Sequence, residues 1–353
     1  MIKKTVFLTL MLVGMMACNG NAKKVTDSDE VAAKPSSQQT EAYVDDYFKV
    51  GAVWHNGFEW YQIRKDGNVI AFIGGTLHEG GACFGLRPNG NNRFDLVPVK
   101  WSLDDGADYE PSLSGMNLYG MNANDLSAEL KFFEGAPVLV IRHKTKGVQS
   151  VLLPAEGNGM EALDRILKAD MARALAGNWR SLDGERYVFG LDQNYTFPNA
   201  KGNYKFEYEY DTPSFIITLQ DGSHWGVQAA DGTMTLSQVR GDQEGETWET
   251  VQGGKKIELA LMIDDQLKWR FTFASTEPLT MGMLANYGKE DLRIMRNEIW
   301  ARHGYRFNSP DLQQRFSRVQ GYTPVSDNSK VQLSKLEQLN VEIIKAAEQQ
   351  PND

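Results

Sequence analysis

The chain has 353 residues, of which 41% are hydrophobic and 24% are charged, proportions that are typical of a globular protein. This length is enough for two or three domains with cores of their own. The formal net charge is −9, and an acidic protein repels phosphate backbones, which argues against nucleic-acid binding.

The N-terminus carries a short apolar segment behind a basic start. Lys3 and Lys4 precede an apolar run from Thr5 to Ala17, which is shorter than the ~20 residues of a membrane-spanning helix. This order is typical of an export signal that is cleaved after a small residue. The closing sequence Met15-Met16-Ala17-Cys18 resembles the lipobox of bacterial lipoproteins, in which the cysteine receives the lipid.

We therefore expect residues 1–17 to be a lipoprotein signal peptide and Cys18 to be lipidated. An uncleaved anchor with an incidental cysteine is the alternative. Residues 18–42 contain almost no bulky apolar side chain, so they cannot bury enough surface to offset their ordering entropy and are predicted to form a flexible tether. The N-terminal lipid would then hold the protein on a membrane of the bacterial cell envelope, and we expect the outer membrane.

From residue 43 to residue 155 the pattern is that of β-strands. Phe58–Arg64 and Val69–Ile73 flank an Asp66-Gly67 turn, which predicts a hairpin. Three further strand-like runs with short separations predict a meander: Leu130–Phe133, Val138–His143 and Val148–Leu153. This region is predicted to be a first β-rich domain.

Residues 156–176 are predicted to link two domains, and residues 160–175 within them change to a helical period. Six apolar residues fall on one helical face: Met160, Leu163, Ile166, Leu167, Met171 and Leu175. The pattern predicts a helix that links two β domains and stops at Gly177.

Residues 177–276 return to alternation and are predicted to form a second antiparallel domain, a barrel or a sandwich. Apolar and polar residues alternate in three runs: Tyr204–Tyr210, Phe215–Leu219 and Leu267–Phe273. The sequence Gly177-Asn178-Trp179 resembles the opening of lipocalin-like barrels. That resemblance implies that a basic residue of the last strand, Lys268 or Arg270, lies over the Trp179 ring, and an ordinary core tryptophan is the alternative.

Residues 280–350 are predicted to be a small helical domain, with helices over Asp291–His303, Pro310–Phe316 and Ser334–Glu348. The sequence from Met295 to Phe307, MRNEIWARHGYRF, resembles the signature of the YARHG domain, with Trp300 where the family name has tyrosine. The resemblance implies a module of exported bacterial proteins, often lipoproteins, for which no biochemical function is agreed.

Two interpretations of this motif remain open. In the structural one, Glu298 and Arg302 are an i,i+4 pair, His303 lies at a helix C-terminus, and Gly304 takes the left-handed position that ends the helix. In the functional one, Arg296, Arg302 and His303 form a small basic site for a carboxylate or a glycan.

Candidate catalytic groups are few. The five histidines show no metal-ligand spacing, so we predict no metal site and no cofactor: His55, His78, His143, His224 and His303. Cys83 could act as a nucleophile with His55, His78 or His143 as its base. The alternative is that this lone cysteine is a small buried hydrophobe.

Together these features predict a mainly β protein with two antiparallel β-rich domains, the second barrel- or lipocalin-like, and a small α-helical C-terminal domain. No catalytic residue set emerges, so we predict a non-enzymatic binding or scaffolding role in the cell envelope, with an envelope protein or a glycan as the partner. The first alternative is carriage of a small apolar ligand in the second barrel. The second alternative is a Cys-dependent hydrolase.

Overall fold

The computed structural model describes residues 46–75, 81–102, 108–111, 113, 121–157, 159–207, 215–241, 247–262 and 268–350. The predicted signal peptide, Cys18 and the tether over residues 18–42 lie outside these ranges, as does His78.

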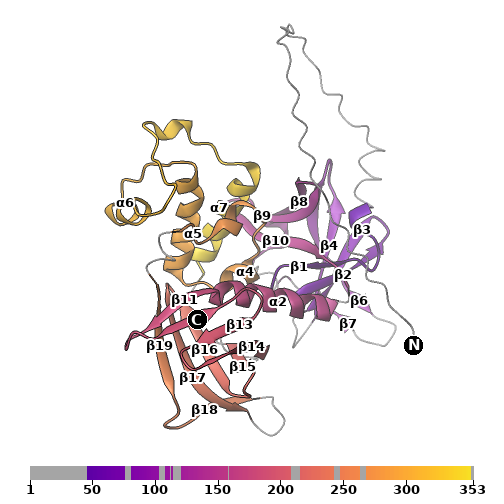
Figure 1. The fold of residues 1–353 in the computed structure, drawn as a ribbon. Coiled ribbons are helices and arrows are strands. Elements are labelled where there is room, and N and C mark those ends of the chain that lie inside the picture. The colour runs from indigo at the N-terminus through magenta and orange to yellow at the C-terminus, as the bar shows by residue number, and fades with distance from the viewer. Residues whose placement is uncertain are drawn as a thin grey trace, which may run out of the picture. The chain divides into compact units, whose positions relative to one another are not determined.

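The first β region closes into an eight-stranded antiparallel barrel with the strand order β1-β10-β9-β8-β5-β4-β3-β2 (Figure 1). Its strands are β1 (Val53–His55), β2 (Trp60–Asp66), β3 (Val69–Gly75), β4 (Gly81–Pro88), β5 (Arg93–Pro98), β8 (Leu126–Phe133), β9 (Ala136–His143) and β10 (Gly147–Ala155). The short strands β6 (Trp101–Ser102) and β7 (Asp108–Tyr109) pair with each other, and the 3-10 turn η2 (Ala123–Asp125) precedes β8.

The predicted hairpin and meander are both confirmed in this barrel. Asp66 pairs with Val69 across the β2–β3 turn, where Gly67 has a φ of 57°, and a left-handed conformation of this kind favours glycine. Strands β8, β9 and β10 follow one another as antiparallel neighbours.

Aromatic rings fill the interior of the first barrel. Phe48 stacks on Trp54 with ring centroids 5.1 Å apart, and Phe72 stacks on Phe84 at 4.8 Å. Aliphatic side chains from the other strands complete this cluster. A core of this kind contributes stability through apolar burial and ring packing.

Helix α2 (Gly159–Leu175) joins the first barrel to the second. Trp60 lies so close to Gly159 that a Cβ added to Gly159 would lie 2.1 Å from the indole ring of Trp60. At the other end, the Trp179 indole nitrogen donates to the backbone oxygen of Leu175 at 2.9 Å. The helix predicted over residues 160–175 is therefore confirmed, and its two ends are fixed by contacts to tryptophans.

The second β region also closes into an eight-stranded antiparallel barrel, through pairing of β16 with β17. Its strands are β11 (Gly177–Ser181), β12 (Arg186–Phe189), β13 (Asn194–Phe197), β14 (Ala200–Glu207), β15 (Phe215–Leu219), β16 (His224–Ala230), β17 (Thr233–Gly241) and β19 (Lys256–Leu261), and β18 (Trp248–Thr250) pairs with β17 as an extra strand. Side chains at alternating positions along these strands fill the interior of the barrel, among them Trp179, Phe189, Tyr204 and Trp225.

The strand expected over Leu267–Phe273 is wrong. The described part of this segment has no strand and leads into the 3-10 turn η3 (Thr272–Ser275). Phe271 and Phe273 pack against Tyr287 in the helical region. The backbone amides of Arg270 and Phe271 donate to the Glu298 carboxylate, so this alternation reflects an extended segment that packs on a helix instead of on a sheet neighbour.

The C-terminal region is helical, as predicted. It contains α4 (Met281–Ala285), α5 (Lys289–Arg302), α6 (Pro310–Phe316), the 3-10 turn η4 (Asn328–Lys330) and α7 (Lys335–Glu348). Helix α7 begins with a capping box in which Ser334 and Glu337 exchange hydrogen bonds, a local device that fixes a helix start.

This helical region shares a hydrophobic core with the outer face of the first barrel. Val138 and Val140 of β9, and Val148 and Val151 of β10, belong to the same buried cluster as the helices. Four consecutive residues of β9, from Val138 to Ile141, are therefore buried, because one face packs in the barrel and the other packs on the helical region.

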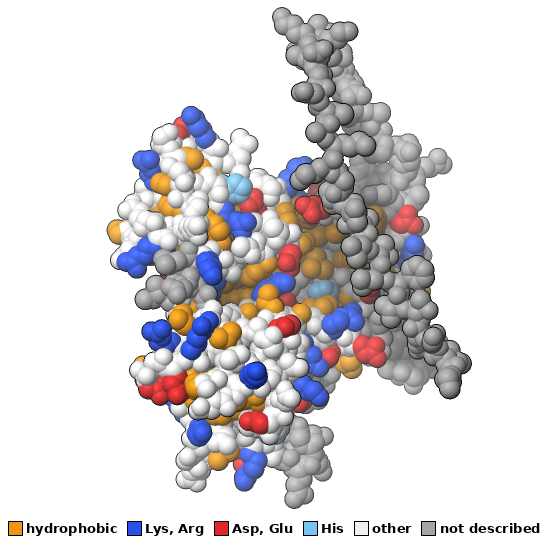
Figure 2. All heavy atoms as spheres, viewed as in Figure 1, with side chains coloured by type: hydrophobic (Ala, Val, Ile, Leu, Met, Phe, Trp, Pro, Cys, Tyr) orange, Lys and Arg blue, Asp and Glu red, His pale blue; other side chains and the backbone are white. Residues whose placement is uncertain are grey.

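Among the described residues, no helix combines the length and the apolar character needed to cross a membrane. On the face drawn in Figure 2, basic and acidic side chains are interspersed.

Candidate functional site

The three predicted binding residues do not meet at one place. Arg296 donates through Nε to both carboxylate oxygens of Glu348, at 3.0 and 3.1 Å. His303 Nε2 lies 2.8 Å from Oε1 of Glu337. Glu337 and Glu348 are eleven residues apart on α7, which corresponds to about 16 Å along the helix axis. Arg296 and His303 therefore clamp α5 to opposite ends of α7.

Arg302 is exposed, and its guanidinium contacts the backbone oxygen of Thr272 at 3.4 Å. The carboxylate of Glu298, predicted to pair with Arg302, instead accepts the amides of Arg270 at 2.9 Å and Phe271 at 2.7 Å. Glu298 is only 2% exposed, and burial raises its pKa to about 7 although both hydrogen bonds act in the opposite direction. Glu298 thus links α5 to the backbone of Arg270 and Phe271 inside the domain.

The helix stop predicted at Gly304 is confirmed. Gly304 has a φ of 78°, its amide donates to Ala301, and the amide of Tyr305 donates to Trp300. This pair of hydrogen bonds is the Schellman arrangement. A Cβ on Gly304 would lie 2.6 Å from the backbone oxygen of Thr323, so the motif fixes both the end of α5 and the path of the following chain.

Two further residues of the helical region have buried roles that the sequence did not predict. Asn340 is fully buried, accepts from the Leu279 amide at 3.1 Å and donates to the oxygens of Ala274 and Glu277 at 2.8 and 2.7 Å. Asp291, 5% exposed, receives both terminal nitrogens of Arg270. Polar residues at apolar positions of a helical period were the available signal, because a buried polar group needs a partner.

The environment of Cys83 is apolar. It is fully buried with Ala71 and Ile73 on the outside of the first barrel, against Val99 and Trp101. Burial raises the pKa of the Cys83 thiol to about 11, which suppresses the reactive thiolate near neutral pH.

The histidines proposed as its base lie in different settings. His55 is 6% exposed, and burial lowers its pKa to about 4. His143 closes the β9–β10 turn by accepting from the Thr145 amide at 3.1 Å. His78 lies outside the described residues.

Lys268 and Arg270, the basic residues implied by the lipocalin resemblance, follow the last barrel strand instead of lying in it. Arg270 is held by Asp291 and by the face of the Phe271 ring, 4.8 Å from its guanidinium carbon. The structure therefore gives Arg270 a role in the helical region.

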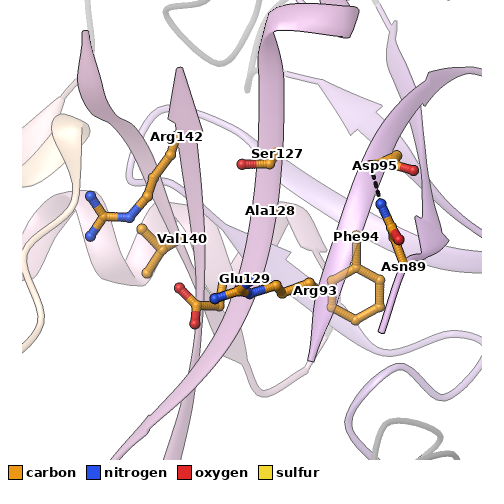
Figure 3. Close-up of a pocket in the computed structure, with 9 residues that line it drawn as sticks. All are labelled: Asn89, Arg93, Phe94, Asp95, Ser127, Ala128, Glu129, Val140 and Arg142. Atoms are coloured by element: carbon orange, nitrogen blue, oxygen red, sulfur yellow. Dashed lines mark hydrogen bonds between the residues drawn. The ribbon is translucent and has the colours of Figure 1, made fainter. Parts of the chain in front are cut away.

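A polar groove lies on the outside of the first barrel, across β5, β8 and β9 (Figure 3). It encloses about 410 Å³ and is lined by Asn89, Arg93, Phe94, Asp95, Ser127, Ala128, Glu129, Val140 and Arg142. The ladder places Arg93 directly opposite Glu129, and Ser127 between Asp95 and Arg142. Groups that donate and groups that accept hydrogen bonds thus lie side by side on three paired strands, with Val140 as the apolar neighbour of Glu129.

Most charges of the groove already have one partner. Asp95 accepts from Asn89 at 2.9 Å, and Glu129 pairs with Lys131 at 3.3 Å. Arg142 pairs with Glu342 of α7, which joins the groove to the helical region. The Arg93 side chain is exposed and forms no hydrogen bond or ion pair with the part of the chain that the structure describes. The groove can therefore offer the Arg93 guanidinium and spare carboxylate oxygens to a polar ligand.

A buried polar cluster lies at the β1–β2 turn. The Glu59 carboxylate, 2% exposed, accepts from Asn56 at 2.9 Å and from the Tyr61 hydroxyl. Burial raises the pKa of Glu59 to about 7. Within the described ranges, no group of three or more His, Cys, Asp or Glu residues is arranged to hold a metal ion.

A comparison with protein families matches the family model described as the YARHG domain to residues 270–349. The match begins at Arg270, ten residues before the start expected from the sequence. No curated protein and no solved structure matches this chain. The C-terminal region that α5 and α7 organise is a YARHG domain, so this chain is a YARHG domain-containing protein with two eight-stranded β-barrels.

Proposed function

We propose that the protein is a lipid-anchored protein of the bacterial cell envelope that binds a partner without transforming it. The observation that carries the binding role is the groove across β5, β8 and β9, where polar groups of both kinds stand on three paired strands. A paired sheet holds its side chains in fixed positions, and preorganised groups lose less entropy on binding.

The groove favours a polar partner that carries both hydrogen-bond donors and acceptors. A peptide segment of an envelope protein and a glycan both have this chemistry. Phe94 is the one aromatic residue among the described residues that line the groove. It is 1% exposed and belongs to the barrel interior, so the described lining offers no ring on which a sugar could stack. This difference favours a peptide segment.

Other observations support binding over the two alternatives. A carrier of apolar ligands needs an open cavity of some hundreds of Å³, whereas side chains pack the described interior of the second barrel. A Cys-dependent hydrolase needs an accessible thiolate, whereas Cys83 is buried and its pKa is raised.

A photo-cross-linking residue at Ser127 in the full chain, expressed in cells, tests the groove. We expect a defined adduct at Ser127, none from the same residue placed at the exposed Lys205 of β14, and a weaker adduct when Arg93→Glu reverses the free charge. Equal labelling at both positions, or an adduct that does not respond to Arg93→Glu, would contradict a recognition role for the groove.

The anchor has a separate test. The cleavable-signal pattern before Cys18 supports lipidation, and Cys18→Ser should move the protein from the membrane fraction to the soluble fraction. A Cys18→Ser protein that is processed normally and stays with the membrane would contradict the lipoprotein assignment while leaving the groove untouched.

A further inference from the structure

A carboxylate of the YARHG domain reaches the groove of the first barrel. Arg142, which lines the groove from β9, forms an ion pair with Glu342 of α7, 200 positions later in the chain. The side chain of Arg142 is 30% exposed and that of Glu342 is 41% exposed. The ion pair therefore lies at the rim of the groove, where solvent and a ligand have access to it.

The lining of the groove continues into the contact between the first barrel and the YARHG domain. Val140 lines the groove and also belongs to the hydrophobic cluster that β9 and β10 share with the helices. Arg142 lies two residues after Val140, on the same face of β9. The groove thus borders the surface on which the YARHG domain packs.

The first barrel contributes one more cation than anion to this surface. The charged side chains in the lining, together with the ion-paired neighbour of Glu129, are Arg93, Lys131, Arg142, Asp95 and Glu129. Arg93 and Arg142 extend from β5 and β9, on either side of β8 (Figure 3). The carboxylate that balances the charge comes from the YARHG domain, through Glu342.

We propose that Glu342 stands in for a carboxylate of the partner, so that the groove takes a peptide segment with Asp or Glu side chains, which displaces Glu342 from Arg142. A guanidinium presents parallel N–H donors that match the two oxygens of either carboxylate. The inference rests on the binding role proposed for the groove, and it adds the chemical class of the partner and a competition with the YARHG domain.

The exposure of the ion pair sets the size of this competition. An exposed pair contributes little free energy, so one carboxylate can replace another, and the loss of Glu342 should strengthen binding by about two- to fivefold. The whole chain is acidic, with a formal net charge of −9. Salt screens charges that lie more than about 8–10 Å apart, so the groups at the groove decide the contact.

Fluorescence anisotropy with the purified full chain tests the class of partner. The probes are three labelled peptides of equal length, in which alanine alternates with glutamate, with glutamine or with lysine, at equal ionic strength. We expect the glutamate peptide to bind most tightly, and we expect Arg142→Gln to remove most of its advantage over the glutamine peptide.

Two substitutions in α7 test the competition. Glu342→Gln should raise the affinity for the glutamate peptide by about two- to fivefold, because Arg142 is then free to bind it. Glu348→Gln is the matched control, since it removes an ion pair of the same helix, to Arg296 at 3.0 Å, that does not line the groove. Its affinity for the glutamate peptide should equal that of the wild-type chain.

The outcomes separate this inference from the binding role itself. Equal affinities of Glu342→Gln and Glu348→Gln would overturn the competition. Tighter binding of the glutamine or lysine peptide, or no binding of any peptide, would overturn the acidic class of partner. In each of these cases a cellular adduct at Ser127 that weakens with Arg93→Glu would still support the groove as a binding site.

Discussion

Gly304 shows how one residue can fix the path of the YARHG domain. Its φ of 78° is unfavourable for any residue with a Cβ, and an added Cβ would also approach the oxygen of Thr323 to 2.6 Å. We expect Gly304→Ala to lower the free energy of unfolding by ~1 kcal/mol or more, measured by urea denaturation. The control, Arg302→Ala, should cost less because Arg302 is exposed; the opposite ranking would make Arg302 the critical residue of the motif.

Glu59 and Glu298 predict a stability that falls as pH rises. Burial raises the pKa of each to about 7 from an ordinary value near 4.5. Between these values the folded state holds more protons than the unfolded state, so the free energy of unfolding decreases as pH increases through that window. Unfolding by urea at several pH values from mildly acidic to neutral should record this decline.

Substitution by glutamine should have different effects at Glu59 and at Glu298. Glu59 accepts both of its hydrogen bonds through one oxygen, so Glu59→Gln should fold and show a flatter pH dependence. Glu298 accepts one amide at each oxygen, and a glutamine must turn an NH₂ group toward one of them. Glu298→Gln should therefore cost about 1–3 kcal/mol; equal behaviour of the two variants would refute this assignment.

At the scale of the elements, Asn340 of α7 makes three hydrogen bonds to the backbone of η3 and of the segment that leads from η3 to α4. Asn340→Ala would leave the Leu279 amide and two backbone oxygens without this partner, and we expect a loss of about 2–4 kcal/mol. Hydrogen exchange should show faster exchange at Leu279. Gln338→Ala is the control, since Gln338 is exposed on the same helix; a similar effect there would mean that α7 itself had weakened.

At the scale of the whole folded unit, two glycines allow the first barrel to contact the YARHG domain. The Gly282 amide donates to the Asn56 oxygen at 3.1 Å, and a Cβ on Gly282 would lie 2.2 Å from the Gly57 carbonyl carbon. We expect Gly282→Ala to separate this turn from α4, which should split thermal unfolding into two transitions in calorimetry. The control is Gly222→Ala, at a turn of the second barrel with open space around it. The φ of 83° at Gly222 strains that turn but no contact between the first barrel and the YARHG domain, so the number of transitions should stay unchanged. A single transition in Gly282→Ala would show that the valine cluster of β9 and β10 suffices for coupling.

The sequence alone determined the order of the β and helical regions of this protein and the family of its last domain. Period-2 alternation with Asp-Gly turns identified the β regions, and helical spacing identified α2, α5, α6 and α7, because these signals arise from neighbouring residues. The motif around Gly304 identified both the YARHG domain and the end of α5. The Cys18 lipid remains a prediction from the sequence.

Only the tertiary structure decided which side chains and backbone groups contact each other. Local alternation could not distinguish a barrel strand from the segment at Arg270, since both are extended, and only the capture of its amides by Glu298 separates them. Two of the basic residues chosen from the motif, Arg296 and His303, belong to one short stretch of sequence but bind opposite ends of α7. The groove across β5, β8 and β9 depends on pairing between residues far apart in the chain, because its lining is assigned by strand pairing and not by spacing.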